Sequence, residues 1–114
     1  MHELSIAMSI LDLVAEEAAH REGRVTAVHL KLGPLAGVVR DALVSAFDLA
    51  RETSATPQVS LVIEDVPIVV HCAACDTDQA LPSLQEMRCP ACGAPAVDIR
   101  TGRELEVVAL ELTS

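Results

Sequence analysis

The sequence predicts an α+β fold in which two helices pack on a three-stranded sheet and a cysteine-rich segment is inserted ahead of the third strand. Apolar residues switch between helical spacing and strand-like alternation, in the order helix, strand, helix, strand, cysteine segment, strand. The length of 114 residues suits one domain with at most a small appended module.

Two segments carry the helical pattern. The first covers residues 3–20, where apolar side chains recur at intervals of three and four and Gly23 suits a C-cap. The stripe that we expect to face the core is Leu4, Met8, Leu11, Ala15 and Ala18, widened by Ile10, Leu13 and Val14. The second helix covers residues 39–51, and its apolar positions are Leu43, Phe47 and Ala50.

The β-branched, alternating segments predict strands at residues 25–32, 59–65 and 105–112. In the first of these, one face consists of Val28, Leu30 and Leu32. The last strand changes phase at Val107–Val108, and a β-bulge there would turn both of its apolar sets toward the core.

The cysteine segment, residues 68–101, is expected to form a separate ribbon domain. Its two ends must return to neighbouring positions of the sheet, so the residues between them fold as a unit of their own. Residues 1–67 together with 102–114 then form the α+β domain.

Two C-x-x-C pairs, separated by 13 residues, form this segment's chemical signature. They are Cys72 with Cys75 and Cys89 with Cys92, the second pair followed by Gly93. A two-residue gap lets both sulfur atoms of a pair reach one ion from a tight turn, and two such turns supply four tetrahedral thiolates. The spacing is that of a zinc ribbon, and four thiolates make the zinc structural rather than catalytic.

Other interpretations of the four cysteines remain open. They could form two disulfides, a thioredoxin-like redox pair or a rubredoxin-type iron site, and His71 could replace one cysteine as a ligand. The cytoplasmic location that we expect disfavours disulfides, and a redox pair needs one C-x-x-C motif, not two. No aromatic residue is near enough in sequence to wrap an iron site.

Charge and composition exclude several classes of partner. Eight basic and 17 acidic residues give a net charge of −9, and Phe47 is the only aromatic residue. Nucleic-acid binding is therefore not expected. No apolar run reaches the length of a membrane span and no secretory signal begins the sequence, so we expect a cytoplasmic protein without a membrane partner.

The first three residues, Met1, His2 and Glu3, form a candidate nickel site. The α-amine of Met1, the following peptide nitrogen and the His2 imidazole can close fused chelate rings, and planar nitrogen donors favour Ni(II) or Cu(II). Glu3 can add a carboxylate oxygen or hold the imidazole from outside the coordination sphere. A histidine at this position is also commonly just a solvated residue. His20 and His29 are expected to be structural, at a helix end and in a strand.

Six segments resemble the HypA/HybF family of hydrogenase nickel-incorporation proteins. They are MHELSIAMSIL, VHLKLGPLAGV, ALVSAF, LVIEDVPIVVHCAAC, CPACG and GRELEVVALEL, which together span nearly the whole chain. The opening MHE and the two C-x-x-C pairs, in this order, are the specific parts.

The resemblance implies a metallochaperone that delivers Ni(II) to the large subunit of NiFe hydrogenase with a HypB-type GTPase. It implies that His2 is the essential nickel ligand, with Glu3 and the Met1 amine close by. It further implies structural zinc on Cys72, Cys75, Cys89 and Cys92. Some relatives also serve urease, and the sequence leaves that choice open. We expect a monomer or a weak homodimer.

Two other classes of function compete with this one. A zinc-ribbon interaction scaffold would use the same ribbon and acidic surface without transporting a metal. An enzyme is not expected, because the spacing of Ser5, Ser9 and His2 recommends no nucleophile and base, and the glycines form no phosphate loop.

Overall fold

The computed structural model describes residues 2–113 of the chain. In chain order the elements are α1 (Glu3–Ala19), β1 (Arg24–Leu32), the short 3-10 helix η1 (Pro34–Ala36), α2 (Arg40–Arg51), β2 (Ser60–Asp65), β3 (Ile68–Cys72), β4 (Thr77–Leu81), β5 (Asp98–Thr101) and β6 (Leu105–Thr113). The two predicted helices and the three predicted strands are all present, each within one residue of the expected bounds.

The chain divides into two compact units. The first contains α1, β1 up to Leu30, the stretch Val38–Glu64 and the chain from Glu106 onward. The second consists of Lys31–Gly37 and Asp65–Leu105. It therefore contains the whole of the 68–101 segment and, in addition, the turn that joins β1 to α2.

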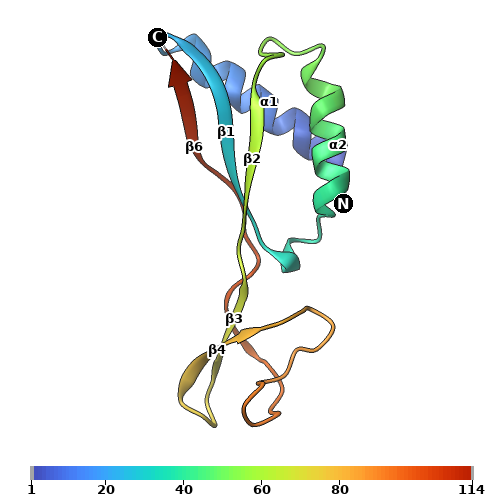
Figure 1. The fold of residues 1–114 in the computed structure, drawn as a ribbon, viewed down its shortest axis with the longest axis vertical. Coiled ribbons are helices and arrows are strands. Elements are labelled where there is room, and N and C mark those ends of the chain that lie inside the picture. The colour runs from blue at the N-terminus through green and yellow to red at the C-terminus, as the bar shows by residue number, and fades with distance from the viewer. Residues whose placement is uncertain (1, 114) are drawn as a thin grey trace. The chain divides into compact units, whose positions relative to one another are not determined.

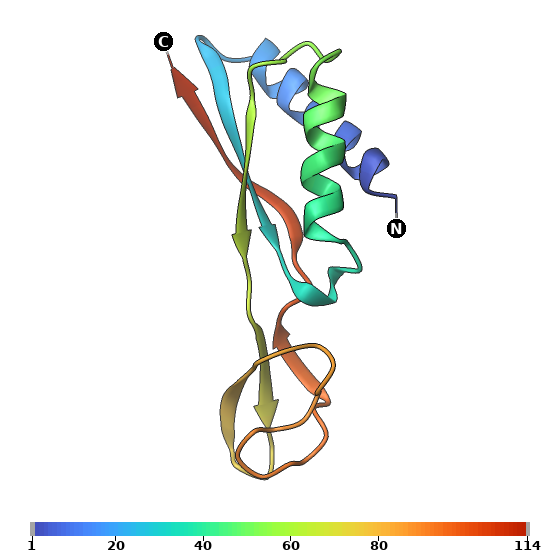
Figure 2. The same cartoon turned by 45° about the vertical axis from the view of Figure 1, so that its right-hand side comes forward.

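The first unit is a three-stranded sheet with strand order β2-β1-β6, and both helices pack on it (Figures 1 and 2). The predicted α+β fold class is thereby confirmed. The helices also pack against each other. The largest fully buried side chains of this unit are Phe47, Leu30, Leu43, Val14, Val25, Val28 and Val59. Neither helix within residues 2–113 combines the length and apolarity that crossing a membrane requires.

The buried face of α1 differs from the expected one. The buried side chains are Ala7, Ile10, Leu11 and Val14. The predicted stripe was wrong for Leu4 and Met8, which are 47% and 54% exposed, and for Leu13, which is 40% exposed. Since α1 is apolar on several faces, its contacts with α2 and the sheet, and not hydropathy alone, decide which face is buried.

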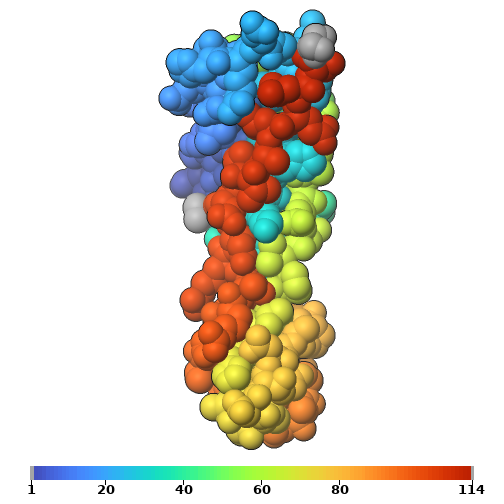
Figure 3. Space-filling view, turned by 90° about the vertical axis from the view of Figure 1, so that its left-hand side faces the viewer, coloured from blue at the N-terminus to red at the C-terminus, as the bar shows by residue number. Residues whose placement is uncertain are grey.

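Strands β1 and β6 match the sequence pattern more closely. Val28, Leu30 and Leu32 of β1 are buried, as predicted. In β6, Val107 and Leu110 are both half-buried although they are three positions apart, so the alternation changes phase between them, as expected. The expectation that both apolar sets of β6 face the core was wrong for Val108 and Leu112, which are exposed. Figure 3 views the face on which β6 (red) lies beside α1 (blue).

The second unit is built on a separate three-stranded sheet with strand order β4-β3-β5, in which both strand pairs are antiparallel. Its buried apolar cluster is Ile68, Val70 and Leu81, against which Leu35, Met87, Ala96 and Ile99 pack. Leu35 joins this cluster from η1, where its N–H donates to the carbonyl of Gly102 over 2.7 Å. The inserted segment thus has a small core of its own.

Candidate metal sites

The first cysteine pair lies on the hairpin between β3 and β4. Cys72 ends β3 and pairs in register with Thr77, so the intervening residues turn the chain back sharply. Asp76 completes this turn with a positive φ of 51°, a conformation that aspartate tolerates better than most residues. The turn brings the Cys75 sulfur back toward that of Cys72.

The second cysteine pair lies on a similar turn ahead of β5. An isolated bridge between Arg88 and Pro95 closes it. Within the turn, the N–H of Cys89 donates to Ala94 and the N–H of Gly93 donates to Cys89, both over 2.8 Å. Gly93 has a φ of 76°, where a side chain would be strained. Both C-x-x-C motifs are therefore tight turns closed by backbone pairing.

The four sulfur atoms converge on one point. Sγ of Cys72 lies 3.5 Å from Sγ of Cys92, and Sγ of Cys75 lies 3.9 Å from Sγ of Cys89. All four lie within 4.8 Å of one another. A tetrahedral ion with metal–sulfur distances of about 2.3 Å requires sulfur–sulfur edges of about 3.8 Å. The cluster can hold a metal such as zinc, and its sulfur atoms are too far apart for disulfides, whose bonds are about 2.0 Å long.

The surroundings of Cys89 and Cys75 shift the pKa values of their thiols in opposite directions. Backbone N–H groups of Cys92 and Ala91 donate to the Cys89 sulfur and lower the pKa of Cys89 to about 7. Contacts with the sulfur atoms of Cys92 and Cys72 raise the pKa of Cys75 to about 12. Because thiolates crowd one another without a cation, the cluster favours a divalent ion that offsets their charge.

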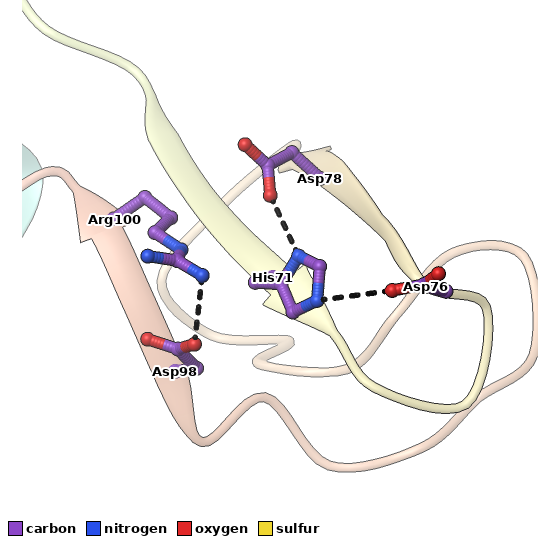
Figure 4. A network of polar contacts seen from close by, with 5 residues as sticks. All are labelled: His71, Asp76, Asp78, Asp98 and Arg100. Atoms are coloured by element: carbon purple, nitrogen blue, oxygen red, sulfur yellow. Dashed lines mark hydrogen bonds and ion pairs between the residues drawn. The ribbon is translucent and has the colours of Figure 1, made fainter.

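His71 lies beside the cluster but is not part of it. Nδ1 of its imidazole contacts Asp78 over 2.9 Å, and Nε2 faces Asp76 over 3.8 Å (Figure 4). Both ring nitrogens thus face carboxylates. On the neighbouring strand β5, Asp98 pairs with Arg100 over 3.2 Å. Sequence reasoning missed the contact between His71 and Asp78, because these two residues become neighbours only through the register of β3 and β4.

His2 lies at the start of α1. It is the exposed N-cap residue, and its carbonyl accepts from the N–H of Ile6 over 3.2 Å to close the first helical turn. Its side chain makes no capping hydrogen bond. The Met1 amine, which we expect to complete the chelate, lies outside the described residues.

Glu3 is the first residue of α1, and it contacts the start of α2. Its Oε2 accepts a hydrogen bond from the N–H of Val39 over 3.2 Å. This bond, followed by one from the backbone of Glu3 itself, holds the pKa of the carboxyl below its usual range. The sequence did not identify Val39 as a partner of Glu3. Its only signal is that Val39 stands at an expected helix N-cap and has no side chain that could cap the helix.

The other two histidines outside the ribbon are placed as expected. His29 lies in β1, and its Nε2 pairs with Oε1 of Glu111 on β6 over 2.8 Å. His20 is the C-cap residue of α1, so the expectation that Gly23 fills this position was wrong. Neither is among the groups of metal-ligating side chains found within the described residues.

These features define a class: a small α+β metal-binding protein with a four-cysteine site on paired turns. The family model described as "Hydrogenase/urease nickel incorporation, metallochaperone, hypA" matches residues 1–112. The chain therefore belongs to the HypA family, whose members are nickel-incorporation metallochaperones in hydrogenase maturation.

Curated relatives extend over nearly the whole chain. The chain is 53% identical to the hydrogenase maturation factor HypA of Roseiflexus sp. (strain RS-1), over 97% of this chain and 91% of the relative. It is 46% identical to the factor of the same name from Chloroflexus aggregans, over 97% and 98% of the two chains.

Solved structures agree with this fold. The solution structure of the nickel metallochaperone HypA from Helicobacter pylori aligns with a TM-score of 0.64 at 27% identity, covering 98% of this chain and 97% of that one. A second solution structure, of a HypA protein, aligns with a TM-score of 0.69 at 27% identity, covering 99% and 97%.

Proposed function

We propose that this protein carries Ni(II) on its amino-terminal residues and delivers it to the large subunit of NiFe hydrogenase. His2 is the principal nickel ligand, the Met1 amine and the adjacent peptide nitrogen complete the chelate, and Glu3 is auxiliary. A HypB-type GTPase is the partner in delivery, which takes place in the cytoplasm. The observation that carries this proposal is the family match, which begins at the first residue of the MHE motif.

The four cysteines are assigned a structural Zn(II) in this proposal. Two of the sulfur–sulfur distances, 3.5 and 3.9 Å, are close to a tetrahedral edge, and sites made of four cysteines are typical of structural zinc. A closed set of four thiolates leaves no open position from which an ion could pass to an acceptor. The exposed imidazole of His2 at the start of α1 suits handover by ligand exchange better.

The charge of the chain fits the proposed partners. A net charge of −9 favours association with basic protein surfaces and disfavours phosphate-rich ones.

Protons compete with nickel for the imidazole and the amine, so acid is expected to release the cargo. The proposal keeps the domain boundaries at 67/68 and 101/102. The ribbon domain, residues 68–101, then has the structural role of stiffening the protein.

A metal titration tests the assignment of nickel to His2. We expect untagged native protein to bind Ni(II) at near-stoichiometric level and His2→Ala to lose most of this affinity, as measured by calorimetry and elemental analysis. His20→Ala, at the opposite end of α1, is the matched control and keeps native affinity. All three proteins are expected to retain zinc.

Two outcomes would overturn the assignment. Unchanged nickel affinity in His2→Ala would remove His2 from the site. Zinc without any nickel binding in the native protein would favour the competing function, a zinc-ribbon interaction scaffold. Adding one residue before Met1 tests the amine donor, because the extension displaces the α-amine and is expected to weaken binding.

A further inference from the structure

The start of α2 lacks part of the capping that helices commonly have. Its N-cap residue is Val39, which makes no side-chain capping hydrogen bond and is among the poorest residues at this position. In a capping box, a Glu or Gln three residues later accepts from the N-cap N–H. That position holds Ala42, which has no acceptor.

Glu3 supplies the missing acceptor from the other helix. Its Oε2 accepts from the N–H of Val39 over 3.2 Å, the bond that the third helical residue of α2 cannot make. The carboxylate therefore lies where two helices begin, because Glu3 itself is in the first turn of α1. Each helix start carries partial positive charge, so both favour an ionised carboxylate there.

The same bond restrains the residue that carries the proposed cargo. His2 directly precedes Glu3, and the carbonyl of His2 closes the first turn of α1 through Ile6. Helix ends fray when nothing holds them, and the side chain of His2 makes no cap of its own. The hydrogen bond that the Glu3 carboxylate accepts from the N–H of Val39 holds this first turn of α1 against the start of α2.

We propose that Glu3 is a positioning residue, which completes the cap of α2 from α1 and thereby fixes the turn that presents His2. Of the two auxiliary roles that the sequence left open for Glu3, this selects the one outside the coordination sphere: its effect on nickel is exerted through the placement of His2 and not through a nickel–carboxylate bond. This inference rests on the proposed function in one respect, that His2 holds nickel. The cap itself is a property of the metal-free protein and is tested separately.

Two substitutions at Glu3 separate positioning from ligation. Glu3→Gln keeps an oxygen that accepts from Val39 but is a poor nickel ligand, whereas Glu3→Ala removes the acceptor. We expect Glu3→Gln to keep nickel affinity close to native and Glu3→Ala to lose about tenfold or more, as for other residues that orient a metal ligand. Asp41→Asn, which removes a charge from the first turn of α2, is the matched control and keeps native affinity.

Hydrogen exchange of the Val39 amide in metal-free protein reports the cap directly. Protection is expected in native protein and Glu3→Gln, and its loss is expected in Glu3→Ala. Adding Ala42→Glu to Glu3→Ala gives α2 an acceptor of its own. The exchange of Val39 then slows again while nickel affinity stays low, because the tie between the helices is still absent.

Three outcomes would overturn the inference. Equal loss of nickel affinity in Glu3→Gln and Glu3→Ala, with Val39 still protected in the former, would make the carboxylate a ligand. Native affinity in Glu3→Ala, or an unprotected Val39 amide in native protein, would remove the positioning role. Failure of native protein to bind nickel would overturn the proposed function together with this role, while the exchange data would still decide the cap.

Discussion

Gly33 lies at a close approach of two backbone segments within the second unit. Its N–H donates to the carbonyl of Glu104 over 2.8 Å, and the N–H of Gly102 donates to Oε1 of Glu104 over the same distance. A Cβ atom at Gly33 would lie 2.2 Å from the carbonyl carbon and oxygen of Gly102. Since backbone atoms cannot swing aside as a flexible side chain can, only glycine fits this position.

Replacing Gly33 with alanine is therefore expected to destabilise the protein by about 3 kcal/mol, the scale of severe overpacking. Gly37→Ala is the control, because Gly37 has a φ of 76° but no atom within 4 Å of its added Cβ. Its cost is the strain of a left-handed conformation, about 1 kcal/mol. Chemical denaturation followed by circular dichroism measures both, and equal losses would contradict the steric explanation.

At the residue scale, the sequence predicted the sites whose geometry is local. The C-x-x-C spacing placed each cysteine pair on one tight turn, because two intervening residues leave the chain few other conformations. The contact between Glu3 and Val39 could not be predicted, since it joins residues 36 positions apart in sequence and depends on how their two helices pack. The approach of Gly33 to Gly102 is long-range in the same way.

α2 contributes Phe47, the largest fully buried side chain among residues 2–113. It is also the only aromatic residue of the chain, so aliphatic side chains supply the rest of the core. Leu43, one turn earlier on the same face, is equally inaccessible. These two side chains are the fully buried ones of α2, which also packs against α1.

Truncating Phe47 to alanine is expected to cost about 3–5 kcal/mol, the range for an aromatic residue removed from a core. Leu49→Ala is the matched control on the same helix, because Leu49 is 65% exposed. Urea titration followed by helical circular dichroism should shift to lower denaturant for the first variant and stay near native for the second. A small effect at Phe47 would mean that the site collapses around the lost ring.

At the element scale, strand patterns were more informative than the pattern of α1. Strand β1 has polar residues between its apolar ones, so alternation identified Val28, Leu30 and Leu32 as its buried face. In α1 the apolar residues surround much of the helix, and nothing in their spacing favoured Ala7 over Leu4. The phase change of β6 was visible in the sequence, but which of its side chains stay exposed depends on the edge position of that strand.

The two units of the whole molecule differ in how they are stabilised. The first has two helices and a sheet around a core that includes Phe47 and Leu43. The second has a buried apolar cluster of Ile68, Val70 and Leu81 together with a cage of four sulfur atoms. Cores this small commonly depend on a metal or disulfides, so the thiolate-bound ion is expected to supply much of this unit's stability.

Removing that ion is expected to loosen the second unit selectively. With a strong chelator, amides of β3, β4 and β5 should lose protection in hydrogen-exchange mass spectrometry, while those of α1 and α2 keep it. Added Zn(II) should restore the protection and added Mg(II), which prefers oxygen ligands, should not. Identical exchange in the second unit with and without the chelator would contradict this division of stability.

The place of β6 in the sheet has a consequence for how the protein is made. The hydroxyl of Thr26 on β1 donates to the carbonyl of Glu111 on β6, a bond that spans 85 positions of the chain. While a ribosome is still adding those residues, β1 has one edge without its partner, and an open apolar edge invites pairing with other chains. The native sheet can close only after β6 has left the exit tunnel, so the edge of β1 that β6 covers stays unpaired until then.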